Sequence, residues 1–389
     1  MTPLPERVFG LERARRLHGD RVDRVAAFLL ECGPLADACV DSFADLPLGQ
    51  GFALLERALR EGIDAVPEAP ESLHGLFAAL DRVPAWVDWN VIDRGGELLL
   101  RSGPFGAMVL GFRSLVLAYS APAGNKPLVM SGRLTEQAGR RLAETGRFVH
   151  KVCLPRALRR DGEGFAIAVK VRVMHAQVRR LLRRSGKWRS EAWGEPINQH
   201  DMVGTILVFS LALIEGLRSL GFRASEEEAE SYVQLWRYAG HVMGVHPDLL
   251  FASEREGRRL SDVIAAFQGP ADDDARALVA ALFSSGLGEA RNRAEALFIR
   301  GYRRFVMGLA RGLVGDQVAD AVDLPDDVFR YAIHAVRPAI GITERIRERS
   351  ALAGRLAVVV GDARWTRVTK MGLGRDVPDY RPPEKLART

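Results

Sequence analysis

The residues best suited to chemistry in this sequence are Arg172, His175 and Arg179. On a helix this spacing places the three side chains on one stripe, beside an apolar stripe that contains Met174 and Val178. Two neighbouring cations lower the pKa of an imidazole, and the neutral imidazole is the form that binds a metal. The same arginines are suited to the carboxylates of an acidic cofactor. An ordinary half-buried histidine with solvated arginines is the simpler explanation of the spacing.

Two further stretches place polar or flexible residues beside apolar helices. Asn198, His200 and Asp201 precede an apolar run, where polar side chains often line a pocket, although helix capping explains Asn198 and Asp201 without any function. Gly240 and Gly244 fall inside a helical pattern, where each glycine costs ~1 kcal/mol relative to alanine. We therefore expect a close neighbour at these glycines, either another helix or a flat ligand.

Familiar metal and nucleotide motifs are absent from the sequence. The eight histidines form no HExxH motif, the three cysteines form no CxxC pair, and no GxSxG, P-loop or dinucleotide fingerprint occurs. One Glu-x-x-His spacing, at Glu71 and His74, falls short of the two such motifs that a di-iron bundle needs. Cys32, Cys39 and Cys153 are expected to be free thiols, because three is too few for a secreted disulfide scaffold.

Composition describes a globular protein that is unusually rich in arginine. The 389 residues are 47% hydrophobic and 27% charged, with a net charge of +6. Only six of the 55 cations are lysine, and the other 49 are arginine, which pairs with carboxylates and tolerates partial burial. Much of this excess is therefore expected in internal ion pairs or against an acidic cofactor. No basic tail indicates a nucleic-acid partner.

No targeting or membrane-spanning segment is expected. The first 25 residues lack the apolar stretch of a signal peptide, and no run reaches the ~18 uninterrupted apolar residues of a membrane span. The sequence therefore predicts a soluble, cytoplasmic protein.

The periodicity is helical almost throughout and predicts an all-α fold. The clearest helices are expected over 135–153, 164–184, 198–221 and 225–243, with a loop over 120–134. A β-branched run at 356–360 is the one good strand signal, and it stands alone.

We expect one large body with four parts. These are N-terminal helices over 1–84, a core over 85–260, C-terminal helices of the same body over 261–380, and a tail over 381–389.

Four stretches carry a resemblance to a known family: KPLVMSGRL (126–134), VRVMHAQVRR (171–180), WGEPINQHDMVGT (193–205) and LWRYAGHVMGV (235–245). Their order and spacing resemble the bacterial latex-clearing proteins and mycophenolate-pathway oxygenases, which share a rubber-oxygenase catalytic domain. The resemblance covers about residues 85–260. It implies a globin-like helical core with added helices and, as in the rubber oxygenases, a haem b that activates O₂ to cleave polyisoprene double bonds.

The resemblance also implies roles for individual residues. In the rubber oxygenases a distal arginine is followed three residues later by a lysine, and a histidine on the next helix holds the iron. Here Arg172 matches the arginine and His175 stands at the lysine position, while the helix expected over 202–220 contains no histidine. His175 is therefore the candidate iron ligand and His241 the reserve, with Arg172 and Arg179 as partners of the haem propionates or of bound O₂.

Two functions follow from these observations. The first is an intracellular haem-b-dependent oxygenase that acts on an apolar, isoprenoid or lipid-like substrate. The second is a cofactor-free helical protein that binds a hydrophobic small molecule in the same pocket.

Overall fold

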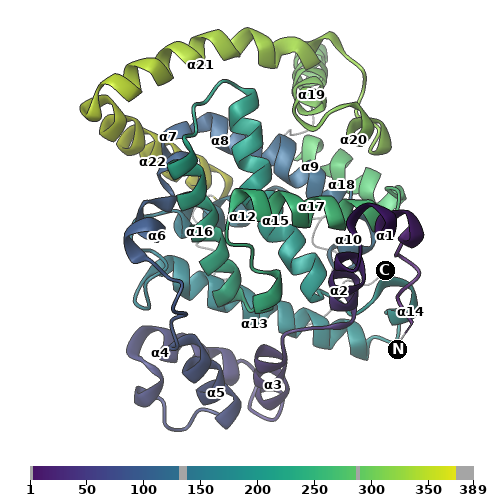
Figure 1. The fold of residues 1–389 in the computed structure, drawn as a ribbon, viewed down its shortest axis with the longest axis vertical. Helices are drawn as coiled ribbons and strands as arrows, with labels where there is room; N and C mark the ends of the chain where they lie inside the picture. Colours follow the sequence, from purple (N-terminus) through teal and green to yellow (C-terminus); the bar gives the residue numbers. More distant parts are fainter. Residues whose placement is uncertain (1–2, 131–137, 286–289, 374–389) are drawn as a thin grey trace.

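The computed structural model describes residues 3–130, 138–285 and 290–373, and Figure 1 shows their arrangement. Within these ranges the secondary structure is helical, without a strand; the one isolated β-bridge joins Val8 to Gln268. The predicted all-α fold is confirmed. The division into four parts stays a prediction.

The longer helices, in chain order, are α1 (Leu11–His18), α3 (Pro34–Phe43), α4 (Gln50–Glu61), α5 (Glu71–Leu80), α10 (Pro122–Met130), α12 (Ala138–Val152), α13 (Glu163–Arg184), α15 (Gln199–Ser219), α16 (Glu226–Met243), α17 (Glu254–Phe267), α18 (Asp273–Ser284), α19 (Arg293–Val314), α21 (Ala332–Arg349) and α22 (Ala351–Leu373). The shorter α-helices are α2 (Arg21–Ala27), α6 (Trp89–Gly95), α7 (Glu97–Ser102), α8 (Pro104–Val109), α9 (Leu115–Tyr119), α14 (Ser190–Trp193) and α20 (Asp316–Ala321). Single turns are η1 (Phe28–Leu30), η2 (Ile63–Ala65), η4 (Pro247–Leu249) and η5 (Val328–Tyr331), and η3 (Leu110–Ser114) is a π-helical turn.

The four helices that the sequence indicates most clearly are α12, α13, α15 and α16. Side chains cap the first turns of two of these helices. The Ser225 hydroxyl accepts the backbone N–H of Glu228, and the Glu228 carboxylate accepts the N–H of Ser225 in return. The Asn198 side chain accepts the N–H of Asp201. Local capping thus sets where α15 and α16 begin.

The loop expected over 120–134 is wrong for its first part, because residues 122–130 form helix α10. Pro122 occupies the first helical position, where the missing N–H is not needed, and only Pro127 lies inside the helix. The Asn125 amide donates to the Tyr119 carbonyl at 2.6 Å and so holds α10 against the end of α9. Residues 131–134 lie outside the described residues.

The β-branched run at 356–360 lies in helix α22 and not in a strand. No described segment offers it a strand partner, while α22 packs along α7 and α12. Tertiary packing therefore decides the conformation of this run, as it often does for β-branched residues.

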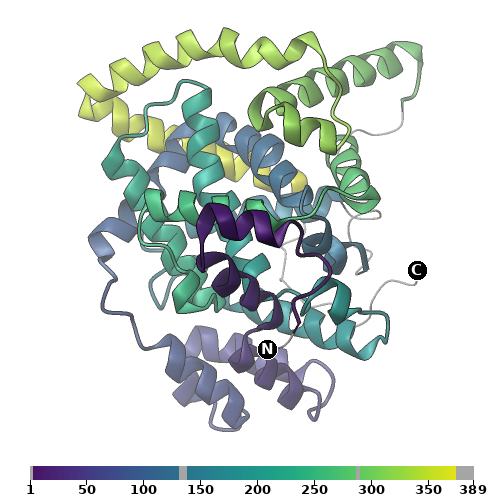
Figure 2. The ribbon, with the colours of Figure 1, turned by 45° about the vertical axis from the view of Figure 1, so that its right-hand side comes forward.

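Helices α13, α15 and α16 pass through the middle of the molecule, and other segments cover them (Figure 1). Helices α3, α4 and α5 lie at the bottom of this view, and α21 crosses the top. After a turn of 45°, α1 and α2 lie across the front of the central helices, in contact with α17 (Figure 2). Residues from the N-terminal, central and C-terminal helices contribute to one hydrophobic core.

One described helix, Gln199–Ser219, is long and apolar enough to span a membrane, and 67% of its most apolar window is buried inside the protein. The pair Pro104–Tyr119 and Pro122–Met130 meets the same criterion jointly but bends by 100°.

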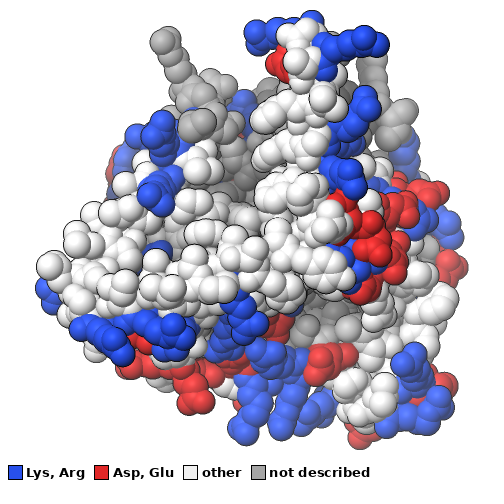
Figure 3. Space-filling view, turned by 90° about the horizontal axis from the view of Figure 1, so that it is seen from above, with Lys and Arg blue, Asp and Glu red and all other residues white. Residues whose placement is uncertain are grey.

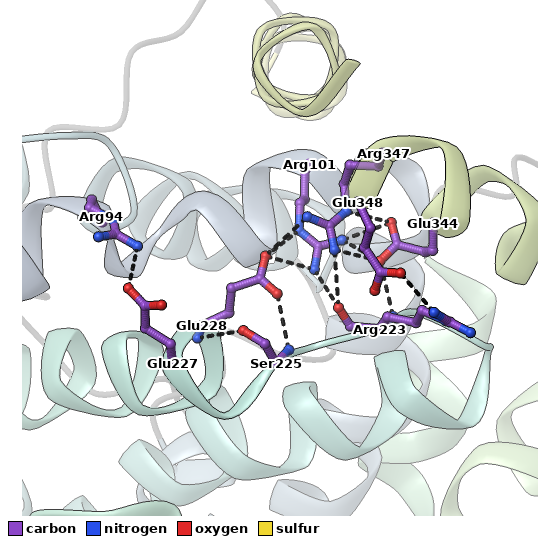
Figure 4. A network of polar contacts seen from close by, with 9 residues as sticks. All are labelled: Arg94, Arg101, Arg223, Ser225, Glu227, Glu228, Glu344, Arg347 and Glu348. Carbon is purple, nitrogen blue, oxygen red and sulfur yellow. Dashed lines mark hydrogen bonds and ion pairs between the residues drawn. The ribbon is translucent and has the colours of Figure 1, made fainter. Parts of the chain in front are cut away.

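A buried ion pair attaches helix α21 to the core (Figure 4). The guanidinium of Arg101 on α7 donates to both carboxylate oxygens of Glu344 on α21, at 2.7 and 2.9 Å, and to Glu228 at the start of α16. It also donates to the Arg223 carbonyl, while the Arg223 N–H donates to Glu344. Both side chains of the Arg101–Glu344 pair are almost completely buried. Three elements distant in sequence therefore meet at one guanidinium.

Replacement of Arg101 by methionine is predicted to lower the free energy of unfolding by about 3 kcal/mol, because Glu344 would keep a buried charge without its main partner. Urea unfolding followed by circular dichroism measures this loss. Arg94→Met is the matched control, since the Arg94–Glu227 pair lies on the surface and is worth less than about 1 kcal/mol. Equal losses in the two variants would contradict the assigned role of the Arg101 network.

Candidate active site

A cavity of about 690 Å³ lies between α9, α10, α13, α15 and α17, and this size is typical of small-molecule and cofactor sites. Most of its wall is aliphatic or aromatic, including Leu115, Tyr119, Met174, Val178, Met202, Ile206, Phe209 and Ile264. The polar side chains that reach it include His175, His200, Asp201, Thr205 and Arg141. The cavity is suited to an apolar molecule, with a few polar contacts.

His175, the candidate iron ligand, lies on the cavity wall. Its Nδ1 atom is buried and has no hydrogen-bond partner among the described residues. Burial, together with the positive charges of Arg179 and Arg141, lowers the pKa of His175 to about 3. The imidazole is therefore neutral at physiological pH, the form that binds iron.

Arg179 does not line this cavity. It is almost completely buried, and its guanidinium lies 2.5 Å from the carboxylate of Asp37 on α3. The three side chains that the sequence places on one stripe therefore do not share this cavity, and helix geometry gives the reason. Seven residues return almost to the same side of a helix, within about 20°, whereas three residues leave His175 about 60° away.

Arg172 lies on the same side of α13 as Arg179, away from the cavity. One of its terminal nitrogens donates to the Val242 carbonyl at 3.2 Å, and its Nε atom is buried without a partner in the described chain. Burial lowers the pKa of Arg172 to about 10, so it still carries a charge at neutral pH. This hydrogen bond joins α13 to the end of α16.

The two glycines of α16 contact protein and not a flat ligand. Gly240 faces Leu250 and Ile206, which would lie 3.1 and 3.4 Å from an added Cβ atom. Gly244 ends the helix with φ +86°, and a Cβ atom there would lie 2.7 Å from Nε of Arg172. Contact with other parts of the protein therefore explains both positions, which agrees with the first of the two alternatives left open by the sequence, a neighbouring helix and not a flat ligand.

His241, the reserve ligand, lies outside the cavity. Its ring packs against those of Tyr238 and Trp86, with centroid distances of 5.9 and 6.3 Å. Burial lowers its pKa, and the charge of Arg172 adds to this effect. His241 belongs to an aromatic cluster on the other side of α16.

His200 is the second histidine on the cavity wall, and the sequence gives it only a minor part. Its Nδ1 atom lies 3.2 Å from Oδ1 of Asp201, and its Nε2 atom is buried with no partner in the described chain. A carboxylate beside one ring nitrogen is the usual way to orient an imidazole toward a metal. Burial lowers the pKa of His200, so this ring is also held neutral.

The N-terminal segment fixes Asp201. Arg7 forms a bidentate ion pair with this carboxylate at 2.7 and 2.8 Å, and Asn198 adds a third donor at 3.0 Å. Although burial alone would raise the pKa of Asp201, the Arg7 charge and the hydrogen bonds with His200 and Arg7 hold it well below its usual value. Arg7 lies 194 residues from Asp201, a separation that no local sequence pattern reveals.

Arg141 on α12 lines the cavity, and its positive charge contributes to the lowered pKa of His175. It takes the position toward the cavity that the sequence assigns to Arg172 and Arg179. A pattern restricted to α13 cannot reveal it, because α12 approaches from another part of the fold.

Replacement of Gly244 by alanine is predicted to destabilise the protein more than replacement of Gly10, which precedes α1 in the same left-handed region (φ +58° and ψ 34°, against +86° and 27° at Gly244) and has no atom near an added Cβ. Left-handed backbone strain costs both variants about 1–2 kcal/mol. The displacement of Arg172 adds about 1 kcal/mol or more in Gly244→Ala alone. Urea unfolding of both variants measures the difference, and equal losses would show that Arg172 does not pack on Gly244.

Comparison with known proteins places the chain in a family. Residues 100–342 match the family described as ER-bound oxygenase mpaB/B'/Rubber oxygenase, catalytic domain. The Rubber oxygenase of Streptomyces sp. (strain K30) is 24% identical over 296 residues, which cover 74% of this chain and 69% of that protein. The latex clearing protein LCP in its closed state has a similar fold, with a TM-score of 0.66 and 21% identity over 85% of this chain and 91% of that one. The protein therefore belongs to the family of mpaB-type and rubber oxygenase catalytic domains.

Proposed function

We propose that this protein is an oxygenase that binds haem b in the large cavity and oxidises an apolar, isoprenoid or lipid-like substrate there. The observation that carries the proposal is a pair of neutral, buried imidazoles, His175 and His200, on the wall of one apolar cavity. Each has a buried ring nitrogen without a partner among the described residues. Family membership supports oxygenase chemistry. Haem, when bound, supplies an iron that activates O₂.

We assign iron ligation to His175, with His200 as second choice. His175 lies in the stretch 171–180 that carries the family resemblance, and the positive charge of Arg141 acts on the same part of the cavity. A cation there complements a propionate. Arg141 thus takes the propionate-binding role that the family resemblance gives to Arg172 and Arg179. The charge of Arg179 is already balanced by Asp37, and Arg172 faces α16.

The remaining cavity residues define the kind of substrate. Aliphatic and aromatic side chains of α9, α15 and α17 bind a hydrocarbon chain and exclude water from it. The polar contacts from His200 and Thr205 are few, so they orient a molecule more than they bind it. An intracellular location, expected from the sequence, stays part of this proposal.

Addition of haem to the purified protein is predicted to give a Soret band that saturates at one haem per chain. His175→Ala is expected to lose or shift this band, because the cavity loses its first imidazole ligand. His241→Ala is the matched control, since His241 lies outside the cavity and its removal is expected to leave the spectrum unchanged. Circular dichroism of each variant verifies that the fold persists.

The same titration separates the alternatives. A spectrum altered by His200→Ala but not by His175→Ala would transfer iron ligation to His200. A wild-type protein that stays colourless with added haem would refute the haem proposal. In that case, binding of a fluorescent apolar probe in the cavity would support the cofactor-free function. The sequence of α15, which has no histidine beyond His200, favours that function.

A further inference from the structure

The exposed large apolar side chains concentrate in the last quarter of the described chain. Before residue 290 they are scattered: Phe9, Leu17, Leu35, Leu48 and Val83. From residue 290 on they are Leu297, Phe298, Tyr302, Phe305, Val328, Tyr331, Ile342, Ile346, Leu352, Leu356, Val359, Val360 and Val368. Single exposed apolar residues need no explanation, whereas a contiguous group indicates an interaction surface.

Helix α22 has an apolar face on each side. Its inner face is fixed to the core: Trp365 donates to the Leu99 carbonyl, and Gly361 packs directly on the backbone of Leu100. Its outer face presents side chains at helical spacing that are 47–69% exposed, namely Leu352, Leu356, Val359 and Val360. The core requires only the inner face, so the outer one is free for another partner.

Helix α21 repeats this arrangement. Ile340 and Glu344 face inward, and Glu344 is held by the Arg101 network (Figure 4). Ile342 and Ile346 point outward with more than half of their surface exposed. The Arg101 network therefore fixes the inner side of α21, while its outer apolar side stays exposed.

Unpaired positive charge accompanies these outer faces. Seven cations of α21 and α22 form no ion pair within the described chain: Arg337, Arg345, Arg349, Arg355, Arg364, Arg367 and Lys370. The acids of the two helices are already engaged, Glu344 with Arg101, Glu348 with Arg223 and Asp362 with His150. Seen from above, a broad uncharged surface is bordered by Lys and Arg, with Asp and Glu gathered at its sides (Figure 3).

A second apolar cavity, of about 500 Å³, lies between α18, α19 and α22. Its wall includes Tyr302 and Val368, which are 44% and 49% exposed, so the cavity reaches the surface beside these helices. Leu115 and Thr145 line both this cavity and the larger one. The two cavities therefore share a wall.

We propose that the outer faces of α21 and α22 dock on an anionic lipid bilayer, and that the second cavity takes apolar molecules from it and passes them to the larger cavity between Leu115 and Thr145. Apolar side chains flanked by arginines match the lipid tails and the acidic headgroups of such a surface. A second copy of the chain fits less well, because a twofold contact would bring the same unpaired arginines together. The docking step stands by itself, while delivery to the larger cavity rests on the proposed function.

The docking test uses phosphatidylcholine vesicles with and without phosphatidylserine and a fluorophore attached at Val359→Cys. The label is expected to shift to the blue on the anionic vesicles only. Leu17→Cys on α1 is the matched control, since Leu17 and Val359 are 62% and 65% exposed in the native protein. Arg364→Gln with Arg367→Gln is predicted to weaken vesicle binding about 25-fold, at about fivefold for each cation lost.

Three results would overturn docking: no binding to anionic vesicles, equal shifts at Leu17 and Val359, or no effect of the double arginine variant. Protection of the Val359 label that depends on protein concentration without lipid would instead show that a second copy covers this face. No haem or substrate enters the assay, so its outcome is separate from that of the haem titration.

Delivery has its own test, with a fluorescent apolar probe supplied in the vesicles. Thr145→Trp, on the wall between the cavities, is predicted to slow entry of the probe at least tenfold while vesicle binding stays unchanged. Val368→Trp at the outer cavity is expected to act in the same way, should Thr145→Trp disturb the fold. Unchanged entry rates in a folded variant would exclude this route, whereas a wild-type protein that never takes up the probe would contradict the proposed function itself.

Discussion

The buried ion pair between Arg179 and Asp37 makes the rest of the site possible. Helix α13 runs through the interior, and a guanidinium at this depth would be strongly destabilising without a partner. Asp37 supplies that partner from α3 and so joins the N-terminal helices to the centre of the fold. The same positive charge, one turn from His175, helps to keep this imidazole neutral inside an apolar cavity.

The arginine-rich composition has the same physical basis at other places. Arg7 holds Asp201 at the cavity, Arg101 holds Glu344 beneath α21, and Arg311 bonds to Asp316 and Asp320 beside α20. In each case a mostly buried guanidinium joins segments through several donors, a geometry that lysine does not provide. Arginines without an ion pair in the described chain lie at the surface of several helices, and α21 and α22 are among them.

Much of the fold could be predicted from the sequence because its signals are local. Helical periodicity and the caps at Ser225 and Asn198 locate the central helices. The spacing on α13 reveals one cause of the low pKa of His175, the charge of Arg179, but not the burial that is the larger cause. The contribution of distant segments could not be predicted. Arg179 faces Asp37 and not the cavity because α3 packs against that side of α13. The orientation of His200 depends on Asp201, which Arg7 holds from the N-terminal segment.

The central claim is that α13 presents a neutral imidazole to an apolar cavity, and the pH titration of the His175 ring by isotope-edited NMR tests it most directly. The account predicts a pKa of about 3, with the ring neutral throughout the range in which the protein stays folded. A His175 ring that takes up its proton near the ordinary value of about 6.5 would show a solvated side chain and contradict the account.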